Sequence, residues 1–255
     1  MGIDFGKTAS DYGKHRQGFP PEFFERLPRY GVGLPGQRAL DLGTGTGTVA
    51  RGLALAGCVT TGLDPSETLM AEGQRLDREA GVSTRYVVGT AEATGLSDDS
   101  FDVVTAGQCW HWFNRPVAVA EVRRVLVPGG ALVVCHFDWI GLPGNVVWVA
   151  ERLIEQHNPA WTFGRGNGIH GQWLGDIEEA GFRDLETFSF DIDAIYTHDA
   201  WRGRIRASAG VAASLPPERV AAFDEELAAI LKRDFPADPL PVHHRVWALI
   251  ARAPE

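Results

Sequence analysis

Apolar residues in the first half of the chain form short continuous runs that alternate with segments of helical period. Runs bounded by turn residues predict β-strands, and apolar positions recurring three and four residues apart predict helices. The predicted strands cover 38–42, 59–63, 84–88, 101–106 and 131–137. The predicted helices cover 48–56, 65–80 and 116–126, and a turn is expected at 128–130. This alternation is typical of an α/β protein with a parallel sheet.

The rhythm changes after Asp138, where helices and polar loops outnumber strands. We predict helices at 145–157, 173–180, 198–209 and 216–235, a loop at 161–172, and strands at 185–195 and 242–251. The expected fold is a Rossmann-like, mostly parallel seven-stranded sheet with helices on both faces and a lid built from insertions after the fifth strand. We expect one domain over 1–255, divided into a cover segment (1–34), a cofactor-binding core (35–138) and lid insertions (139–172 and 197–240).

Composition narrows the class of partner. The formal net charge is −9 and no run of Lys or Arg is present, which argues against a nucleic-acid substrate. No apolar run has the length of roughly 18–20 residues that a membrane span needs, and the first residues carry no apolar signal core. The three cysteines lie far apart and form no metal-binding pair. We therefore expect a cytoplasmic monomer or homodimer that neither binds nucleic acid nor enters a membrane.

The strongest chemical signal is the loop that follows the first strand. Gly43, Gly45 and Gly47 stand between this strand and a helix, where glycines let the backbone turn tightly and approach a ligand. A dinucleotide fingerprint would place glycine at position 48, which is Thr here. Asp41 precedes the loop and suits a ligand with a cationic amine or sulfonium. Asp64 ends the second strand, where a carboxylate can accept hydrogen bonds from ribose hydroxyls or cap the next helix.

Four successive segments resemble the motifs of class I S-adenosylmethionine-dependent methyltransferases: ALDLGTGTGTVARGLALAG, VTTGLDPSETLMAEG, VVGTAEATGLSDDSFDVVTAGQCWHWF and EVRRVLVPGGALVV. The sub-group that they most resemble includes the trans-aconitate and ubiquinone/menaquinone-type methyltransferases, and DYGKHRQGFP resembles its N-terminal segment. The resemblance implies S-adenosylmethionine as cofactor and a small-molecule acceptor.

The resemblance also implies a role for each matching residue. The glycines would hold the amino-acid end of the cofactor with Asp41 near its amine, Asp64 would hold the ribose, and residues 90–92 would flank the adenine. Many relatives have Asp where this chain has Thr90, so adenine recognition would fall more on the backbone of Ala91. The full predicted cofactor-binding set is Tyr12, Arg16, Asp41, Gly43, Thr44, Gly45, Gly47, Asp64, Pro65, Thr90, Ala91, Glu92 and Gln108.

Methyl transfer is an in-line displacement that often requires removal of a proton from the acceptor. Histidine is the natural base near neutral pH, and position selects His15, His111 and His136 as candidates, with a purely structural role as the alternative. An acceptor that arrives ionised would need no base. The predicted substrate residues are Trp139, Arg165, His170 and His243, and no catalytic metal is expected.

The acceptor is not named by these motifs. Tryptophans concentrated after residue 130 favour a planar or apolar metabolite, such as an aromatic or carboxylate compound, methylated on O, C or N. Two other interpretations remain open from the sequence: a methyltransferase-like protein that uses the bound cofactor without transferring methyl, and a nicotinamide-dependent oxidoreductase.

Overall fold

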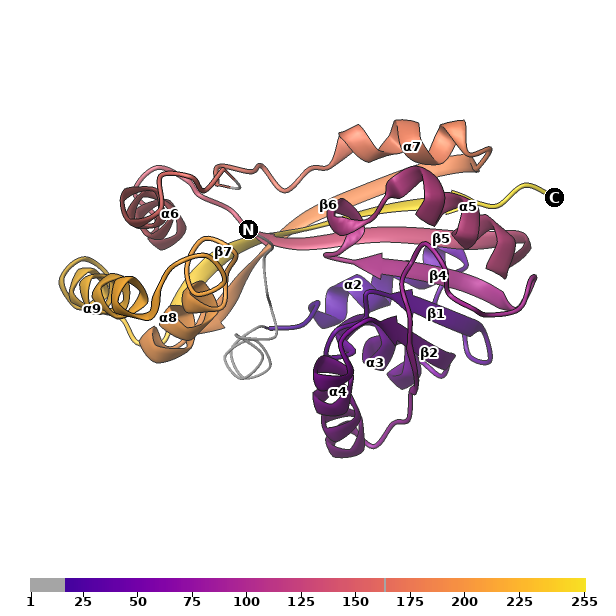
Figure 1. The fold of residues 1–255 in the computed structure, drawn as a ribbon, viewed down its shortest axis with the longest axis horizontal. Helices are drawn as coiled ribbons and strands as arrows, with labels where there is room; N and C mark the ends of the chain where they lie inside the picture. Colours follow the sequence, from indigo (N-terminus) through magenta and orange to yellow (C-terminus); the bar gives the residue numbers. More distant parts are fainter. Residues whose placement is uncertain (1–16, 163) are drawn as a thin grey trace. The chain divides into compact units, whose positions relative to one another are not determined.

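The computed structural model describes residues 17–162 and 164–255. Its centre is a seven-stranded sheet with the order β3-β2-β1-β4-β5-β7-β6 (Figure 1). The four neighbouring pairs from β3 to β5 are parallel, as the alternating pattern predicts. The strands are β1 (Arg38–Leu42), β2 (Val59–Asp64), β3 (Arg85–Val88), β4 (Phe101–Gly107), β5 (Leu126–Trp139), β6 (Arg183–Tyr196) and β7 (Leu240–Arg252).

Helices connect these strands. The α-helices are α2 (Pro21–Arg26), α3 (Thr48–Leu55), α4 (Glu67–Ala80), α5 (Arg115–Val125), α6 (Val146–His157), α7 (Leu174–Glu179), α8 (His198–Arg206) and α9 (Pro217–Asp234). Short 3-10 helices are η2 (Leu27–Tyr30), η3 (Trp110–Trp112) and η4 (Gly171–Trp173). The predicted α/β, mostly parallel, Rossmann-like sheet is confirmed.

The chain divides into two compact units. The core unit comprises Gly18–Phe137, His170–Phe190 and Val246–Glu255, and the insertion unit comprises Asp138–Ile169 and Asp191–Arg245 together with Gln17. The insertion unit overlaps the segments that the sequence predicts as a lid, with somewhat different bounds. Whether these segments cover a substrate remains a prediction.

In the core unit, α5 and α7 lie along one face of the sheet and α2, α3 and α4 along the other (Figure 1). Strands sandwiched in this way are apolar on both faces, which explains the continuous apolar run in β5, buried from Ala131 to Phe137. The core also contains the fully buried indole of Trp110, which follows β4. Packing on both faces leaves the strand ends as the place where polar residues can meet a ligand.

Two local predictions are corrected. The turn expected at 128–130 is instead part of β5, which pairs with β4 on both sides of an irregular register between Phe101 and Val103. Pro65 does not open α4. The helix begins at Glu67, and the Ser66 hydroxyl caps it by accepting a hydrogen bond of 3.3 Å from the Leu69 N–H.

The insertion unit is held together by contacts of α9 with α6 and α8. Arg202 and Arg206 of α8 both form ion pairs with Asp224 of α9, and the Arg206–Asp224 distance is 2.7 Å. Among residues 17–162 and 164–255, none of the helices combines the length and apolar composition needed to cross a membrane.

Candidate cofactor and acceptor site

The glycine loop leaves the carboxyl end of β1 and leads into α3. Gly43, Gly45 and Gly47 have φ values of +57°, +54° and +75°, in the left-handed region that side chains with a Cβ rarely adopt. The Thr44 N–H donates to the Leu63 carbonyl at 3.0 Å, and this bond anchors the loop to the end of β2. The backbone conformation of the loop therefore requires glycine at all three positions.

The three glycines differ in what surrounds them. A Cβ at Gly47 would lie 2.2 Å from the Tyr86 hydroxyl oxygen, and a Cβ at Gly43 would lie 2.9 Å from Cβ of Cys109. A Cβ at Gly45 would meet no heavy atom within 4 Å in the part of the chain that the structure describes. Gly45 thus presents bare backbone to open space, which is the cradle that a bound cofactor requires.

Asp41 lies behind the loop with an exposed fraction of 3%. Its carboxylate accepts hydrogen bonds from the hydroxyls of Thr105, at 2.6 Å, and Thr44, at 2.7 Å. Burial raises the pKa of Asp41 to about 6, while the two hydroxyls act in the opposite direction. Thr105 is not among the residues that the sequence predicts, although a hydroxyl inside an apolar strand is the signal that could have revealed it.

Asp64 lies at the carboxyl end of β2, directly beside the loop. One carboxylate oxygen accepts from the Gly45 N–H at 2.9 Å and the other from the Ser66 N–H at 2.8 Å. Burial raises the pKa of Asp64, and the two backbone bonds counteract this increase. Each oxygen retains a second lone pair, so the fixed carboxylate can still accept a hydrogen bond from a ligand.

The predicted adenine-flanking residues follow β3. Thr90 is exposed, Ala91 is buried, and the Glu92 carboxylate accepts from the Asn114 N–H at 2.8 Å. Gln108 follows β4 with a φ of +63°, unusual for a residue with a side chain. Its N–H donates to the Cys135 carbonyl at 2.9 Å, and its side-chain amide donates to the Phe137 carbonyl. Such local strain is typical of functional sites.

Three predicted histidines come together in the core unit. The exposed His111, within η3, has its ring centroid 5.6 Å from that of His136, which is 3% exposed near the end of β5. The ring centroid of His170 lies 4.2 Å from that of His136. His170 stacks on Trp173 at 4.3 Å with an interplanar angle of 4°. The sequence indicates each histidine separately but gives no sign of their proximity.

The remaining predicted substrate residues belong to the insertion unit. Trp139 donates from Nε1 to Glu151 at 3.0 Å. The Arg165 side chain pairs with Glu155 at 2.8 Å, and His243 lies 3.2 Å from Asp193. The predicted cover residues Tyr12, His15 and Arg16 lie outside the described residues.

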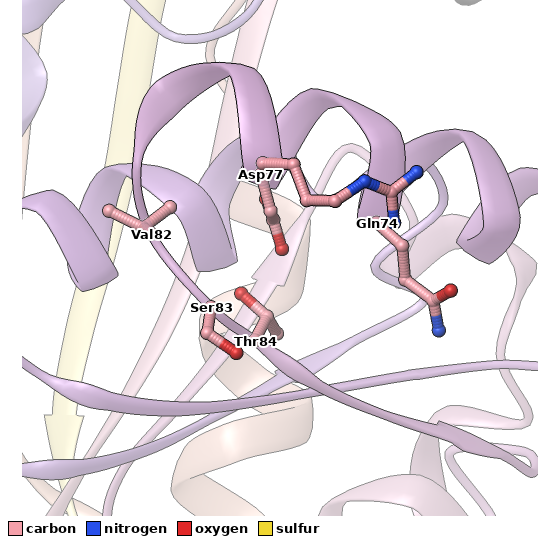
Figure 2. A pocket seen from close by; sticks show the side chains of 6 residues that line it. Gln74, Asp77, Val82, Ser83 and Thr84 are labelled. Atoms are coloured by element: carbon pink, nitrogen blue, oxygen red, sulfur yellow. The ribbon is translucent and has the colours of Figure 1, made fainter.

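A separate hollow opens on the core unit between the end of α4 and the start of β3 (Figure 2). It has a volume of about 210 Å³ and is lined by Gln74, Asp77, Arg78, Val82, Ser83 and Thr84. Thr84 precedes β3, so the hollow lies at the amino end of this parallel strand, whereas the glycine loop lies at the carboxyl ends. The hollow is therefore distinct from the candidate cofactor site.

Comparison with known proteins agrees with this geometry. Residues 40–134 match the model of a methyltransferase domain. The chain is 34% identical to an uncharacterized methyltransferase of Mycobacterium tuberculosis, over 64% of this chain and 71% of that protein. It is 38% identical to the ubiquinone/menaquinone biosynthesis C-methyltransferase of Paracoccus denitrificans, over 66% of this chain and 74% of that protein.

Among solved structures, a protein described as a type II methyltransferase from Anaeromyxobacter dehalogenans matches with a TM-score of 0.67 and 26% identity, over 94% of this chain and 99% of that chain. These matches exclude the nicotinamide-dependent alternative. The chain belongs to the class I methyltransferases that depend on S-adenosylmethionine.

Proposed function

We propose that the protein transfers a methyl group from S-adenosylmethionine to a small-molecule acceptor at the carboxyl ends of β4 and β5. The observation that carries this proposal is the open side of Gly45 beside the fixed carboxylate of Asp64. A ligand with a ribose and a flexible amino-acid arm suits this juxtaposition. The cofactor, when bound, supplies an electrophilic methyl group on a sulfonium.

Different residues of the core unit would bind different parts of the cofactor. Asp64 would accept hydrogen bonds from the ribose hydroxyls, and residues 90–92 would flank the adenine from the end of β3. Asp41 would act mainly through the loop, since both of its oxygens are already engaged by threonine hydroxyls. Gln108, held by two hydrogen bonds to β5, would face the methionine end.

The three-histidine cluster supports a role in proton transfer. His111 is exposed, so its ring can reach a proton on the acceptor, whereas His136 is buried and His170 is stacked on Trp173. We infer that His111 is the general base and that His136 and His170 position it. The relative from Paracoccus is named for ubiquinone/menaquinone biosynthesis, which makes planar ring compounds the first class of acceptor to screen.

Calorimetric titration with S-adenosylhomocysteine tests the cofactor site. Asp64→Asn should weaken binding by about tenfold to a hundredfold, because a hydrogen bond to a charged group contributes about 1.5–3 kcal/mol. Asp102→Asn is the matched control: it removes the same charge at the start of β4, where Asp102 pairs with Arg38. Equal affinities in the two variants would contradict the assignment of Asp64.

Labelled S-adenosylmethionine and a metabolite panel then test transfer. With an acceptor in hand, His111→Ala should lower turnover by about 10²–10⁴-fold while the affinity for S-adenosylhomocysteine stays unchanged. Near-normal turnover at saturating acceptor would show that positioning alone supplies the rate. A parallel loss of stability and cofactor affinity would assign His111 a structural role instead.

A further inference from the structure

The insertion unit contains a cationic side chain set among aromatic rings. Cζ of Arg204, on α8, lies 4.5 Å from the centroid of the Trp139 ring. Trp139 meets Trp201 edge to face at 5.6 Å, and Trp201 meets Tyr196 at 5.4 Å. His244 lies nearly parallel to Tyr196 at 5.9 Å. These contacts form one cluster, the Arg204 cluster, made of Arg204, Trp139, Trp201, Tyr196 and His244.

The buried members of the cluster hold the half-buried members in place. Trp201, Tyr196 and His244 have exposed fractions of 0%, 2% and 2%, whereas Trp139 and Arg204 are half-buried. Trp139 is fixed further by its hydrogen bond to the buried carboxylate of Glu151. The two partly exposed members are therefore an indole ring and the guanidinium that lies over it, packed against buried neighbours.

Arg204 differs from other arginines of the insertion unit in its ion pairing. Arg202 and Arg206, on the same helix, share the carboxylate of Asp224, and Arg245 pairs with Asp191. For Arg204, by contrast, the described residues provide no carboxylate within 4.0 Å, although the charge of Asp138 acts on it from further away.

The other titratable ring in the cluster adds no positive charge near neutral pH. Burial lowers the pKa of His244 to about 4, so this ring is neutral there. Burial also lowers the pKa of Arg204, although Tyr196, which forms a hydrogen bond with the guanidinium, and the charge of Asp138 both act in the opposite direction. Its guanidinium has parallel donors that match a carboxylate, and the indole provides a surface for a flat ring.

We propose that Arg204 and Trp139 bind the carboxylate and the ring of a planar, carboxylate-bearing acceptor. The inference rests on the proposed function, because it names the substrate class of the same enzyme. Within this class, the guanidinium fixes the orientation of the acceptor and the indole selects for flatness. A neutral analogue of the same shape loses the charge-assisted hydrogen bonds and binds more weakly.

The test uses para-fluorobenzoate and its neutral analogue para-fluorobenzamide as probes of the full-length protein, saturated with S-adenosylhomocysteine. Fluorine NMR titration should show tighter binding of the benzoate by about tenfold or more. Arg204→Met should abolish this preference. Arg204→Lys should retain part of it, because lysine keeps the charge but lacks the two-pronged geometry. Arg233→Met, which removes an exposed charge of the same unit, is the matched control and should retain it fully.

Equal binding of the two probes to the unaltered protein would overturn the proposal, and so would an undiminished preference in Arg204→Met. If Arg204→Met does not fold, the lysine variant and the probe comparison in the unaltered protein still decide. Calorimetry with S-adenosylhomocysteine separates this inference from the proposed function. If the unaltered protein does not bind S-adenosylhomocysteine, the proposed function is wrong. The fluorine titration tests only the role of Arg204.

Discussion

An alanine scan of the three loop glycines should separate folding from cofactor binding. The three positions share a left-handed backbone, so alanine costs each about 1–2 kcal/mol of stability from backbone strain. They differ in what the new methyl group meets. At Gly45 it meets open space, at Gly43 the Cys109 side chain, and at Gly47 the Tyr86 hydroxyl. The order of destabilisation should therefore be Gly47→Ala, then Gly43→Ala, then Gly45→Ala.

The contact distances set the sizes of these effects. At Gly47 the Cβ would lie 2.2 Å from the Tyr86 oxygen, so the phenol must move and break its 3.0 Å hydrogen bond to Asp77. Overpacking of about 1–3 kcal/mol and a lost bond of about 1 kcal/mol add to the strain, giving a total of about 3–6 kcal/mol. At Gly43 the Cβ would lie 2.9 Å from Cβ of Cys109, which must shift, so overpacking of about 1–3 kcal/mol adds to the strain and about 2–5 kcal/mol is expected in total.

Gly45→Ala should behave differently, because its methyl group enters the space assigned to the cofactor. Its melting temperature should fall by only about 2–8 °C, at roughly 2–4 °C per kcal/mol for a chain of this size. Its affinity for S-adenosylhomocysteine should fall by about tenfold or more. Chemical denaturation and calorimetry measure the two quantities. If Gly45→Ala binds normally, or loses as much stability as Gly47→Ala, the assigned cradle is wrong.

Two further predictions concern the buried carboxylate behind the loop. The folded pKa of Asp41, about 6, exceeds its ordinary value of 3.8. The folded state therefore holds the proton of Asp41 more tightly than the unfolded state. The free energy of unfolding falls as pH rises from the ordinary pKa to the folded pKa. The loss should be about 2 kcal/mol between about pH 4.5 and about pH 7.5, and denaturation of Asp41→Asn should lack this component. Thr105→Val removes a 2.6 Å hydrogen bond to the same carboxylate and should cost about 1.5–3 kcal/mol at neutral pH, again measured by denaturation. No loss in Thr105→Val would mean that Thr105 does not stabilise the charged form.

The elements of the core unit could be predicted because their signals are local. Glycine allows the left-handed turns of a loop, and an apolar run between turn residues favours a strand, in both cases without help from distant residues. The turn expected at 128–130 is wrong for the opposite reason. Leu126 pairs with Phe101 and Ala131 with Val103, so the sheet recruits the intervening residues into β5 despite their turn-like composition. Tertiary pairing here overrides local preference.

The residues proposed to bind the cofactor show the same contrast between local and long-range signals. Gly45 lies in the loop after β1 and Asp64 is the last residue of β2, so the chain order alone indicates that they lie at one edge of a parallel sheet. Thr105 escapes prediction because its role depends on register: it pairs with Asp41 across a ladder that joins residues 64 positions apart. A hydroxyl inside an apolar strand marks Thr105 as unusual, but only the register identifies Asp41 as its partner.

The acceptor side depends still more on long-range placement. His111 and His136 become neighbours because β4 and β5 pair in parallel, with Gly107 opposite Cys135. His170 joins them from a loop beyond the inserted helix α6, held by its stack on Trp173 rather than by strand register. The loop that carries His170 can vary in sequence without altering the glycine loop after β1, because binding residues on loops vary among proteins that share one scaffold. Substitution of His170 should therefore alter acceptor preference with little effect on cofactor affinity, whereas substitution of the register-bound His136, buried in the sheet, should also reduce stability.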